Sequence, residues 1–128
     1  MINIIKSHHP LRQIKSFKYA FQGIFHAFLN EPNFRVQLLI VAISTALGFY
    51  FHISKIEWGF LVLTLGMLLS AEILNTIVEE FIDNLIKEYH EGAKVIKDMS
   101  AGFVLTSAVI SLVILYLVFW DKIVFSFF

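Results

Sequence analysis

Polar side chains recur on one face of a strongly apolar stretch, between residues 70 and 83. The face carries three carboxyls and an amide, from Glu72, Asn75, Glu79 and Asp83. On a helix with about 100° per residue, this spacing places them in one stripe roughly 80° wide. A carboxylate near hydrocarbon costs on the order of several kcal/mol unless it has a partner or a function. The stripe therefore predicts a functional site. The competing interpretation, solvation at the membrane surface, suits Glu80 better than Glu72.

The residue types in and near the stripe suit phosphoryl transfer. Glu31, Glu79 and Asp83 offer hard oxygen ligands for Mg²⁺, which takes one or two carboxylates and keeps positions for phosphate and water. Lys97 could neutralise a phosphate, and Glu72, the deepest carboxyl, suits a base that accepts a hydroxyl proton. The chain contains neither a Walker loop nor a kinase-type glycine loop, so a nucleotide site would be built differently. These residues alone leave a membrane enzyme and an ion-handling protein open, and favour the enzyme.

Composition restricts the class of protein. The chain has 128 residues, of which 58% are hydrophobic, above the roughly 45–50% that is usual in soluble domains. Its formal net charge is zero, which argues against the basic surface typical of nucleic-acid binding. The absence of cysteine excludes disulfides, thiolate nucleophiles and zinc–thiolate sites. We expect a single-domain, all-α membrane protein.

Hydropathy divides the chain into four helical segments after a mobile N-terminus at residues 1–10. Apolar residues recur at helical spacing over 11–29, with basic residues elsewhere on the turn, which predicts an amphipathic surface helix. Pro32 predicts a break before the next helix. Apolar runs then predict transmembrane spans at 34–51, 58–78 and 99–120. His8 and His9 could bind metal, although a mobile end is the simpler interpretation.

Basic residues predict the orientation in the membrane. The N-terminal side and the loop after the second span carry eight of them, Lys6, Arg12, Lys15, Lys18, Arg35, Lys87, Lys94 and Lys97. The opposite side carries two, Lys55 and Lys122. This bias predicts a cytoplasmic N-terminus and an outside C-terminus. The carboxylate stripe would then face cytosolic nucleotide.

Several separated motifs carry a family resemblance. They are Asn-Glu-x-x-Phe-Arg at 30–35, Ala-Glu-Ile-Leu-Asn-Thr-x-x-Glu at 71–79, Glu-Tyr-His at 88–90 and Ala-Lys-x-x-Lys-Asp-Met at 93–99. In this order, with the apolar spans between them, they resemble the prokaryotic integral-membrane diacylglycerol kinase family, which includes undecaprenol kinases. The resemblance implies a lipid kinase of the bacterial plasma membrane that uses ATP and Mg²⁺ in phospholipid or cell-envelope lipid recycling. It also implies a homotrimer with active sites shared between subunits.

The resemblance further implies residue roles. Glu72 matches the proton acceptor, Glu31 and Glu79 match the metal-binding glutamates, and Asn75 and Asp83 match site-shaping positions. The implied ATP contacts are Arg12, Tyr19, Glu31, Glu79, Glu88, Tyr89, His90, Lys97 and Asp98. The implied lipid contacts are Ser16, Phe17, Lys18, Tyr19, Ala20, Phe21, Phe25, His26, Ala27, Phe28, Asn33, Phe34, Arg35, Val36, Gln37 and Glu72.

Two positions depart from relatives, and other functions compete. Phe21 stands where some relatives have tryptophan and Ala101 where some have serine, while residues 48–58 look more like the undecaprenol kinase branch. The substrate, diacylglycerol or undecaprenol, stays open. An ion- or proton-coupled transporter subunit would place polar residues deeper and in more than one span, and a purely structural subunit would not need Glu72. Arg12 and Lys18 could also be simple headgroup anchors.

Overall fold

Four helices make up the described part of the chain. The structure, a computed structural model, describes the backbone of residues 10–127 and the side chains of residues 13–126. The helices are α1 (Pro10–Asn30), α2 (Pro32–Tyr50), α3 (Lys55–Leu85) and α4 (Glu91–Phe127). The predicted all-α fold is confirmed for this range. The expected mobile end, apart from Pro10, and the His8–His9 pair lie outside the described residues.

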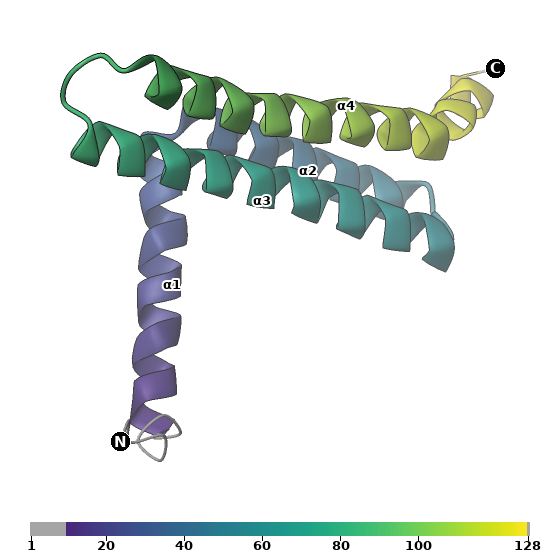
Figure 1. Ribbon diagram of the computed structural model, residues 1–128. Helices are drawn as coiled ribbons and strands as arrows, with labels where there is room; N and C mark the ends of the chain where they lie inside the picture. Colours follow the sequence, from purple (N-terminus) through teal and green to yellow (C-terminus); the bar gives the residue numbers. More distant parts are fainter. Residues whose placement is uncertain (1–9, 128) are drawn as a thin grey trace.

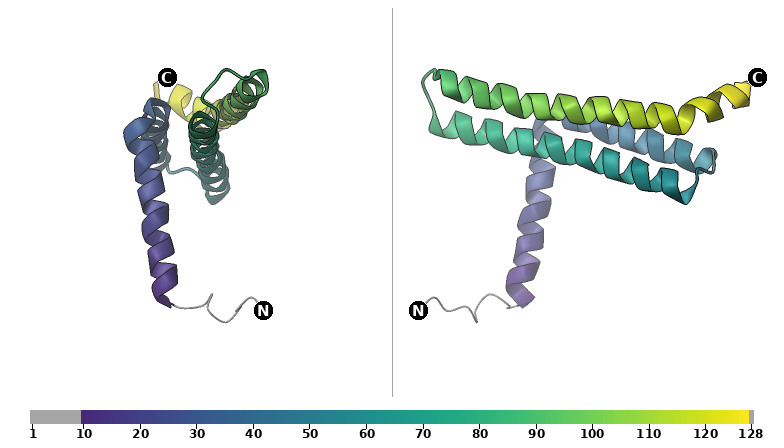
Figure 2. Two further views of the ribbon diagram at one scale, coloured as in Figure 1. Left: turned by 60° about the vertical axis from the view of Figure 1, so that its left-hand side comes forward. Right: turned by 45° about the vertical axis from the view of Figure 1, so that its right-hand side comes forward.

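Three of the helices form a bundle and α1 leaves it. Helices α3 and α4 run side by side, α2 lies against them, and α1 points away from the end of the bundle where α2 begins (Figures 1 and 2). The loop between α3 and α4 is at that same end, whereas the α2–α3 turn and the C-terminus are at the other (Figure 1). The end that carries α1 therefore gathers the start of α2, the end of α3 and the start of α4.

The junction between α1 and α2 follows from Pro32 and Arg35. Glu31, the single non-helical residue between the two helices, is extended, with φ −101° and ψ 108°, and Pro32 starts α2. Proline suits the first helical position, because its missing N–H would have no partner there. Arg35 Nη1 donates to the carbonyl oxygens of Phe28 (3.0 Å) and Leu29 (2.8 Å), two of the last carbonyls of α1. The predicted break is thus observed, and Arg35 ties its two sides together.

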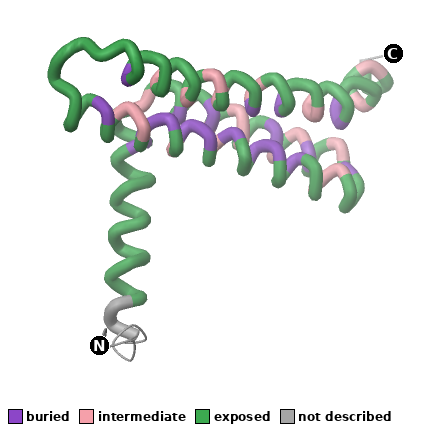
Figure 3. Tube along the Cα trace, in the orientation of Figure 1, coloured by how far each residue is buried: buried purple, intermediate pink, exposed green. Residues whose placement is uncertain are grey.

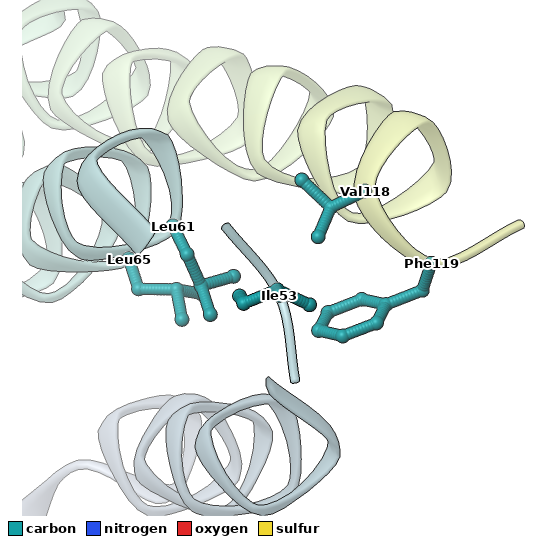
Figure 4. Close-up of a cluster of buried hydrophobic side chains, with 5 residues drawn as sticks. All are labelled: Ile53, Leu61, Leu65, Val118 and Phe119. Carbon is teal, nitrogen blue, oxygen red and sulfur yellow. The ribbon is translucent and has the colours of Figure 1, made fainter. Parts of the chain in front are cut away.

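The opposite end of the bundle is closed by a capped turn. The Ser54 N–H donates to Glu57 Oε2 (2.6 Å) and the Glu57 N–H donates to Ser54 Oγ (3.3 Å), a capping box that starts α3 at Lys55. Trp58 packs on Gly48, where an added Cβ would lie 2.8 Å from the indole ring. Beside this turn, Ile53 and Leu61 pack with the buried side chains of Leu65, Val118 and Phe119 (Figure 4). The main apolar core therefore lies away from the α1 end.

Three helices are long and apolar enough to cross a membrane, namely α2, α3 and α4. Buried residues are concentrated along α3, and α1 is almost entirely exposed (Figure 3). Helix α4 begins at Glu91, eight residues before the predicted third span, since its polar start at 91–98 is helical as well. The bounds of the spans within the membrane stay a prediction.

Candidate functional site

Glu72 is buried inside the bundle and has an amide partner. Its side chain is 1% exposed, on α3, and its Oε2 accepts a hydrogen bond of 2.8 Å from Nε2 of Gln37 on α2. Gln37 is itself 7% exposed, and its Oε1 is buried without a hydrogen-bond partner. Gln37 of α2 therefore provides a hydrogen bond to one oxygen of the Glu72 carboxyl, and its own Oε1 remains as an unpaired acceptor. The sequence placed Gln37 among lipid contacts but did not predict this bond.

A carboxylate cluster, which we define as Glu31, Glu72, Glu79 and Glu80, forms where α1, α2 and α3 meet. Partial burial raises the pKa of Glu31 above its usual 4.5, the carboxylates of Glu79, Glu72 and Glu80 raise it further in that order, and His26 opposes them. His26, five residues before Glu31, lies 3.5 Å from Glu80 (Nε2 to Oε1), so the end of α1 approaches α3 at the level of these carboxyls, in agreement with their effect on Glu31. The predicted metal residues, Glu31 and Glu79, thus influence each other although 47 positions lie between them in the sequence.

Asn75 holds one member of the cluster. Its Nδ2 donates to Glu79 Oε1 at 3.1 Å, and its Oδ1 accepts from Oγ of Ser100 on α4 at 2.7 Å. Asn75 is 9% exposed. The site-shaping role of Asn75 stays a prediction, and these two bonds give it a geometric basis. Ser100 was missed by the sequence analysis; its signal is a hydroxyl three residues after Lys97, at the start of an apolar run.

A second group of predicted residues lines a polar pocket of about 350 Å³ between the end of α3 and the start of α4. We call it the loop pocket. Its lining includes six predicted residues, Asp83, Glu88, Tyr89, His90, Lys97 and Asp98, together with Ile82, Ile86, Ala93 and Lys94. The implied ATP contacts of residues 88–98 are therefore gathered in one place.

Lys97 and Asp83 are paired with each other inside the loop pocket. Lys97 Nζ donates to Asp83 Oδ1 at 2.9 Å and Oδ2 at 3.0 Å. Asp83 is thus engaged with a cation, whereas the sequence had grouped it with Glu31 and Glu79 as an oxygen ligand. Glu79 also attracts the Lys97 ammonium, although less than Asp83 does, which links the loop pocket electrostatically to the carboxylate cluster.

An open groove with an aromatic lining runs between α1 and the start of α2. The aromatic groove, of about 670 Å³, is lined by Lys18, Phe21, Gln22, Ile24, Phe25, Phe28, Phe34 and Leu38. Five of these are among the predicted lipid contacts, namely Lys18, Phe21, Phe25, Phe28 and Phe34. The structure therefore brings the aromatic part of that set together.

The other predicted lipid contacts have different surroundings. His26 Nε2 lies 3.5 Å from Glu80 Oε1, Ala27 is buried, and Arg35 bonds to the end of α1. The remaining ones are exposed and do not line the aromatic groove: Ser16, Phe17, Tyr19, Ala20, Asn33 and Val36. Tyr19, also an implied ATP contact, does not line the loop pocket, and the side chain of Arg12 lies outside the described residues.

The carboxylate cluster can be tested for its fit to a metal ion. Among the described residues, no three His, Asp or Glu side chains are arranged to hold a metal on their own. Mg²⁺, however, is usually bound through one or two carboxylates plus substrate phosphates and water. Glu31 and Glu79 supply that number of carboxylates, and mutual repulsion between them is what a divalent cation would relieve. The donor set fits a metal that arrives with a nucleotide.

Comparison with known proteins identifies the family. Residues 18–119 match the family model of prokaryotic diacylglycerol kinase. The chain is 37% identical over 111 residues to an undecaprenol kinase of Bacillus subtilis, covering 87% of this chain and 90% of the relative. It is 37% identical over 101 residues to a diacylglycerol kinase of Synechocystis, covering 77% of this chain and 57% of that longer relative. It is 27% identical over 110 residues to the diacylglycerol kinase of Escherichia coli, covering 86% of this chain and 90% of the relative. The resemblance read from the separated motifs is confirmed, and the chain belongs to the prokaryotic diacylglycerol kinase family.

Proposed function

We propose that this chain transfers the γ-phosphate of ATP to the hydroxyl of a membrane lipid alcohol, with Glu72 as the proton acceptor. Membership of the family makes the chain a lipid kinase, a membrane enzyme. The acceptor is diacylglycerol or undecaprenol, which would yield phosphatidic acid or undecaprenyl phosphate. The observation that carries the assignment of Glu72 is its burial, at 1% exposure, with one oxygen held by Gln37.

The Glu72–Gln37 pair suits a hydroxyl substrate. A buried carboxylate is kept near a membrane where it has a partner and a function, and Gln37 is that partner. Gln37 Nε2 donates to Glu72 Oε2, which leaves Glu72 Oε1 for the proton of a substrate hydroxyl, and a general base must lie within hydrogen-bond reach of that proton. The unpartnered Gln37 Oε1 offers an acceptor for a second hydroxyl or a bound water beside it.

Glu31 and Glu79 are the residues that would hold Mg²⁺. When bound with ATP, the ion would supply positive charge that offsets the negative charge developing on the transferred phosphoryl group. The chain's own contribution is to bring the two carboxylates together from the α1–α2 junction and from α3, and to orient Glu79 through Asn75. Burial and the neighbouring carboxylates together raise the Glu31 pKa, which supports a site that binds a cation.

The loop pocket would take the nucleotide. Most of its lining residues are charged or polar, and one of them, Lys97, is also attracted by Glu79, so a phosphate chain bound there could reach the metal residues. Phosphate would compete with Asp83 for the Lys97 ammonium. Tyr19 lies on α1 and does not line this pocket, so its implied ATP contact fits a pocket on a neighbouring subunit. We therefore keep the homotrimer with shared active sites as part of the proposal.

The aromatic groove would receive the lipid at the membrane surface. In the proposal α1 is an amphipathic surface helix whose phenylalanines lie at the acyl boundary, while Lys18 meets headgroups. The exposure of Phe21 (69%) and Phe25 (58%) supports it, because such rings are unfavourable in water and favourable against acyl chains. The groove is open, so it can admit a lipid from the side.

The proposed setting is the bacterial plasma membrane, with the N-terminus in the cytoplasm. The α1 junction, the carboxylate cluster and the loop pocket share one end of the bundle, and the α2–α3 turn is at the other (Figure 1). Apart from Lys6, which lies outside the described residues, the basic residues predicted as cytoplasmic belong to α1, to the start of α2 or to the segment around the α3–α4 loop, at the end that carries the proposed site. Nucleotide and chemistry would therefore meet on the cytosolic side.

A phosphotransfer assay with separate acceptors tests the proposal. Purified protein in detergent is given radiolabelled ATP and Mg²⁺ with diacylglycerol, with undecaprenol, or with both in competition. We expect transfer to at least one of them, and a loss of about 10²-fold or more in Glu72→Gln, which keeps size but lacks the base. Asp121→Asn, an exposed acidic residue at the far end of α4, serves as the matched control.

Two outcomes would contradict parts of this proposal. Transfer to neither lipid would overturn the substrate class. Activity of Glu72→Gln within a few-fold of Asp121→Asn would show that Glu72 is structural. The comparisons give no support to the alternative of a transporter subunit, and within the bundle the hydroxyls of Thr64 and Ser111 bond to each other at 3.2 Å, which satisfies them as packing groups.

A further inference from the structure

A hydroxyl on α4 is linked to Glu79 through Asn75. Ser100 Oγ lies 2.7 Å from Asn75 Oδ1, and Asn75 Nδ2 lies 3.1 Å from Glu79 Oε1. Asn75 and Glu79 share one face of α3, while Ser100 belongs to the neighbouring helix. Two hydrogen bonds in series therefore connect α4 to the carboxylate cluster.

The direction of these bonds follows from the chemistry of the three groups. An ionised carboxylate only accepts, so Glu79 requires the NH₂ end of the Asn75 amide. The carbonyl end of that amide then faces Ser100, and only a hydroxyl proton can satisfy it. Asn75 is 9% exposed, so water is a poor substitute for the hydroxyl. Ser100 thus fixes the orientation of the Asn75 amide, whose NH₂ group then points toward Glu79.

The Ser100 hydroxyl has a second possible acceptor. Its Oγ also lies 2.8 Å from the backbone carbonyl of Lys97, one turn earlier on α4, and a hydroxyl carries a single proton. Donation to Lys97 would leave the buried Asn75 Oδ1 without a donor. An unsatisfied buried polar group costs more free energy than a second hydrogen bond contributes at a backbone carbonyl that already has its helical bond. The Ser100 hydroxyl proton is therefore donated to Asn75.

We propose that Ser100 is a positioning residue that acts through Asn75 to hold the Glu79 carboxylate in the orientation that binds the Mg²⁺–nucleotide. The inference rests on the proposed metal role of Glu79. Groups that orient a metal ligand from behind it typically change metal affinity or activity by about 10–100-fold when removed. Ser100 itself touches neither ATP nor lipid in this proposal.

A matched pair of serine variants on one helix tests the inference. Ser100→Ala removes the link, while Ser107→Ala removes a more buried hydroxyl that donates to the carbonyl of Phe103 in its own helix, at 3.0 Å. Alanine favours helix at both positions, so both variants are expected to fold. The readouts are the Mg²⁺ concentration at half-maximal activity, kcat at saturating Mg²⁺, and Mn²⁺ binding with a non-hydrolysable ATP analogue, followed by electron paramagnetic resonance without turnover.

We expect Ser100→Ala to raise the half-maximal Mg²⁺ concentration and weaken Mn²⁺ binding by about 10-fold or more, with kcat at saturating metal within a few-fold. Ser107→Ala should leave both unchanged, and Ser100→Thr, which retains a hydroxyl, should stay near wild type. Combining Ser100→Ala with Asn75→Ala should cost no more than Asn75→Ala alone, because the serine acts through the amide.

The failures can be told apart. If Glu79→Gln leaves metal dependence and Mn²⁺ binding unchanged, the proposed metal role itself fails. If Glu79→Gln weakens metal binding but Ser100→Ala does not, or if Ser100→Ala and Ser107→Ala behave alike, only the positioning role is overturned. An additive loss in the Ser100–Asn75 double variant would also overturn it.

Discussion

Gln37→Met isolates the contribution of the amide that holds Glu72. Methionine fills a similar volume but cannot donate a hydrogen bond, so the change leaves the Glu72 carboxylate buried without its donor. Glu72 is 1% exposed and Gln37 is 7% exposed, with 2.8 Å between Nε2 and Oε2. Neither solvent nor another described side chain offers Glu72 a replacement. The variant therefore tests whether the pair stabilises the bundle.

The magnitude lies between two reference values. Hydrogen bonds to charged groups contribute about 1.5–3 kcal/mol, whereas those between membrane helices average about 0.6 and reach about 1.7 kcal/mol. The acceptor here is a carboxylate and the pair is fully buried, which places it at the upper end of the second range. We expect Gln37→Met to lower the free energy of unfolding by about 1.5 kcal/mol.

A double variant separates this bond from general packing. Gln37→Met combined with Glu72→Met removes both polar partners, and such replacement is nearly neutral or stabilising. The double variant should therefore be more stable than Gln37→Met alone. Unfolding is followed by far-UV circular dichroism during denaturant titration in mixed micelles, with Gln13→Met on the exposed surface of α1 as control. A Gln37→Met change within about 0.5 kcal/mol of that control would refute the reasoning.

Three further predictions concern the cation site and the topology. Because its carboxyl pKa is raised in the folded state, Glu31 stabilises folding only below its usual pKa of 4.5 and loses that contribution as pH rises through the higher folded value. Glu31→Gln should therefore raise the melting temperature at pH 7 without Mg²⁺ and converge with wild type near pH 4; equal melting curves throughout would contradict the repulsion. Glu31→Gln and Glu79→Gln should each raise the Mg²⁺ requirement, and the double variant should lose less than the sum in free energy, as residues that serve one ion do; strict additivity would indicate separate roles. Single cysteines placed in residues 52–57 should be labelled from the outside of intact cells by a membrane-impermeant reagent; labelling only after lysis would reverse the proposed orientation.

Local signals in the sequence were sufficient for the helices and the break between the first two. Pro32 acts on its immediate neighbours, and the apolar runs are long enough that no other element fits them. The earlier start of α3, at Lys55, was also available, because Ser54 and Glu57 have the spacing of a capping box. Reading α3 from Trp58 overlooked that pattern.

Contacts between helices could not be predicted in the same way. Helix α2 is apolar on nearly every side, so its sequence does not say that Gln37 faces Glu72 rather than lipid. The pairing of Asp83 with Lys97 depends on the path of the α3–α4 loop, which brings the start of α4 beside the end of α3. The spacing of the stripe residues on α3 does not distinguish Asp83 from the other carboxyls. Ser100 became visible only when α4 was placed against Asn75. Family motifs identified residues that matter, and the structure supplied their partners.

The proposed cation site also explains how two separate substrate regions could act in one reaction. Burial and the neighbouring carboxylates make an ionised Glu31 unfavourable without a counter-ion, so a divalent cation would be stabilising there. Glu31 is the junction residue between α1 and α2, while Glu79 is on α3 and attracts Lys97 of the loop pocket. An ion held by both glutamates would fasten the base of α1, and hence the aromatic groove, to the nucleotide side of the bundle. In this proposal the Mg²⁺–nucleotide orders the lipid-binding helix as well as the phosphate, because the charge repulsion that it relieves lies at that helix's point of attachment.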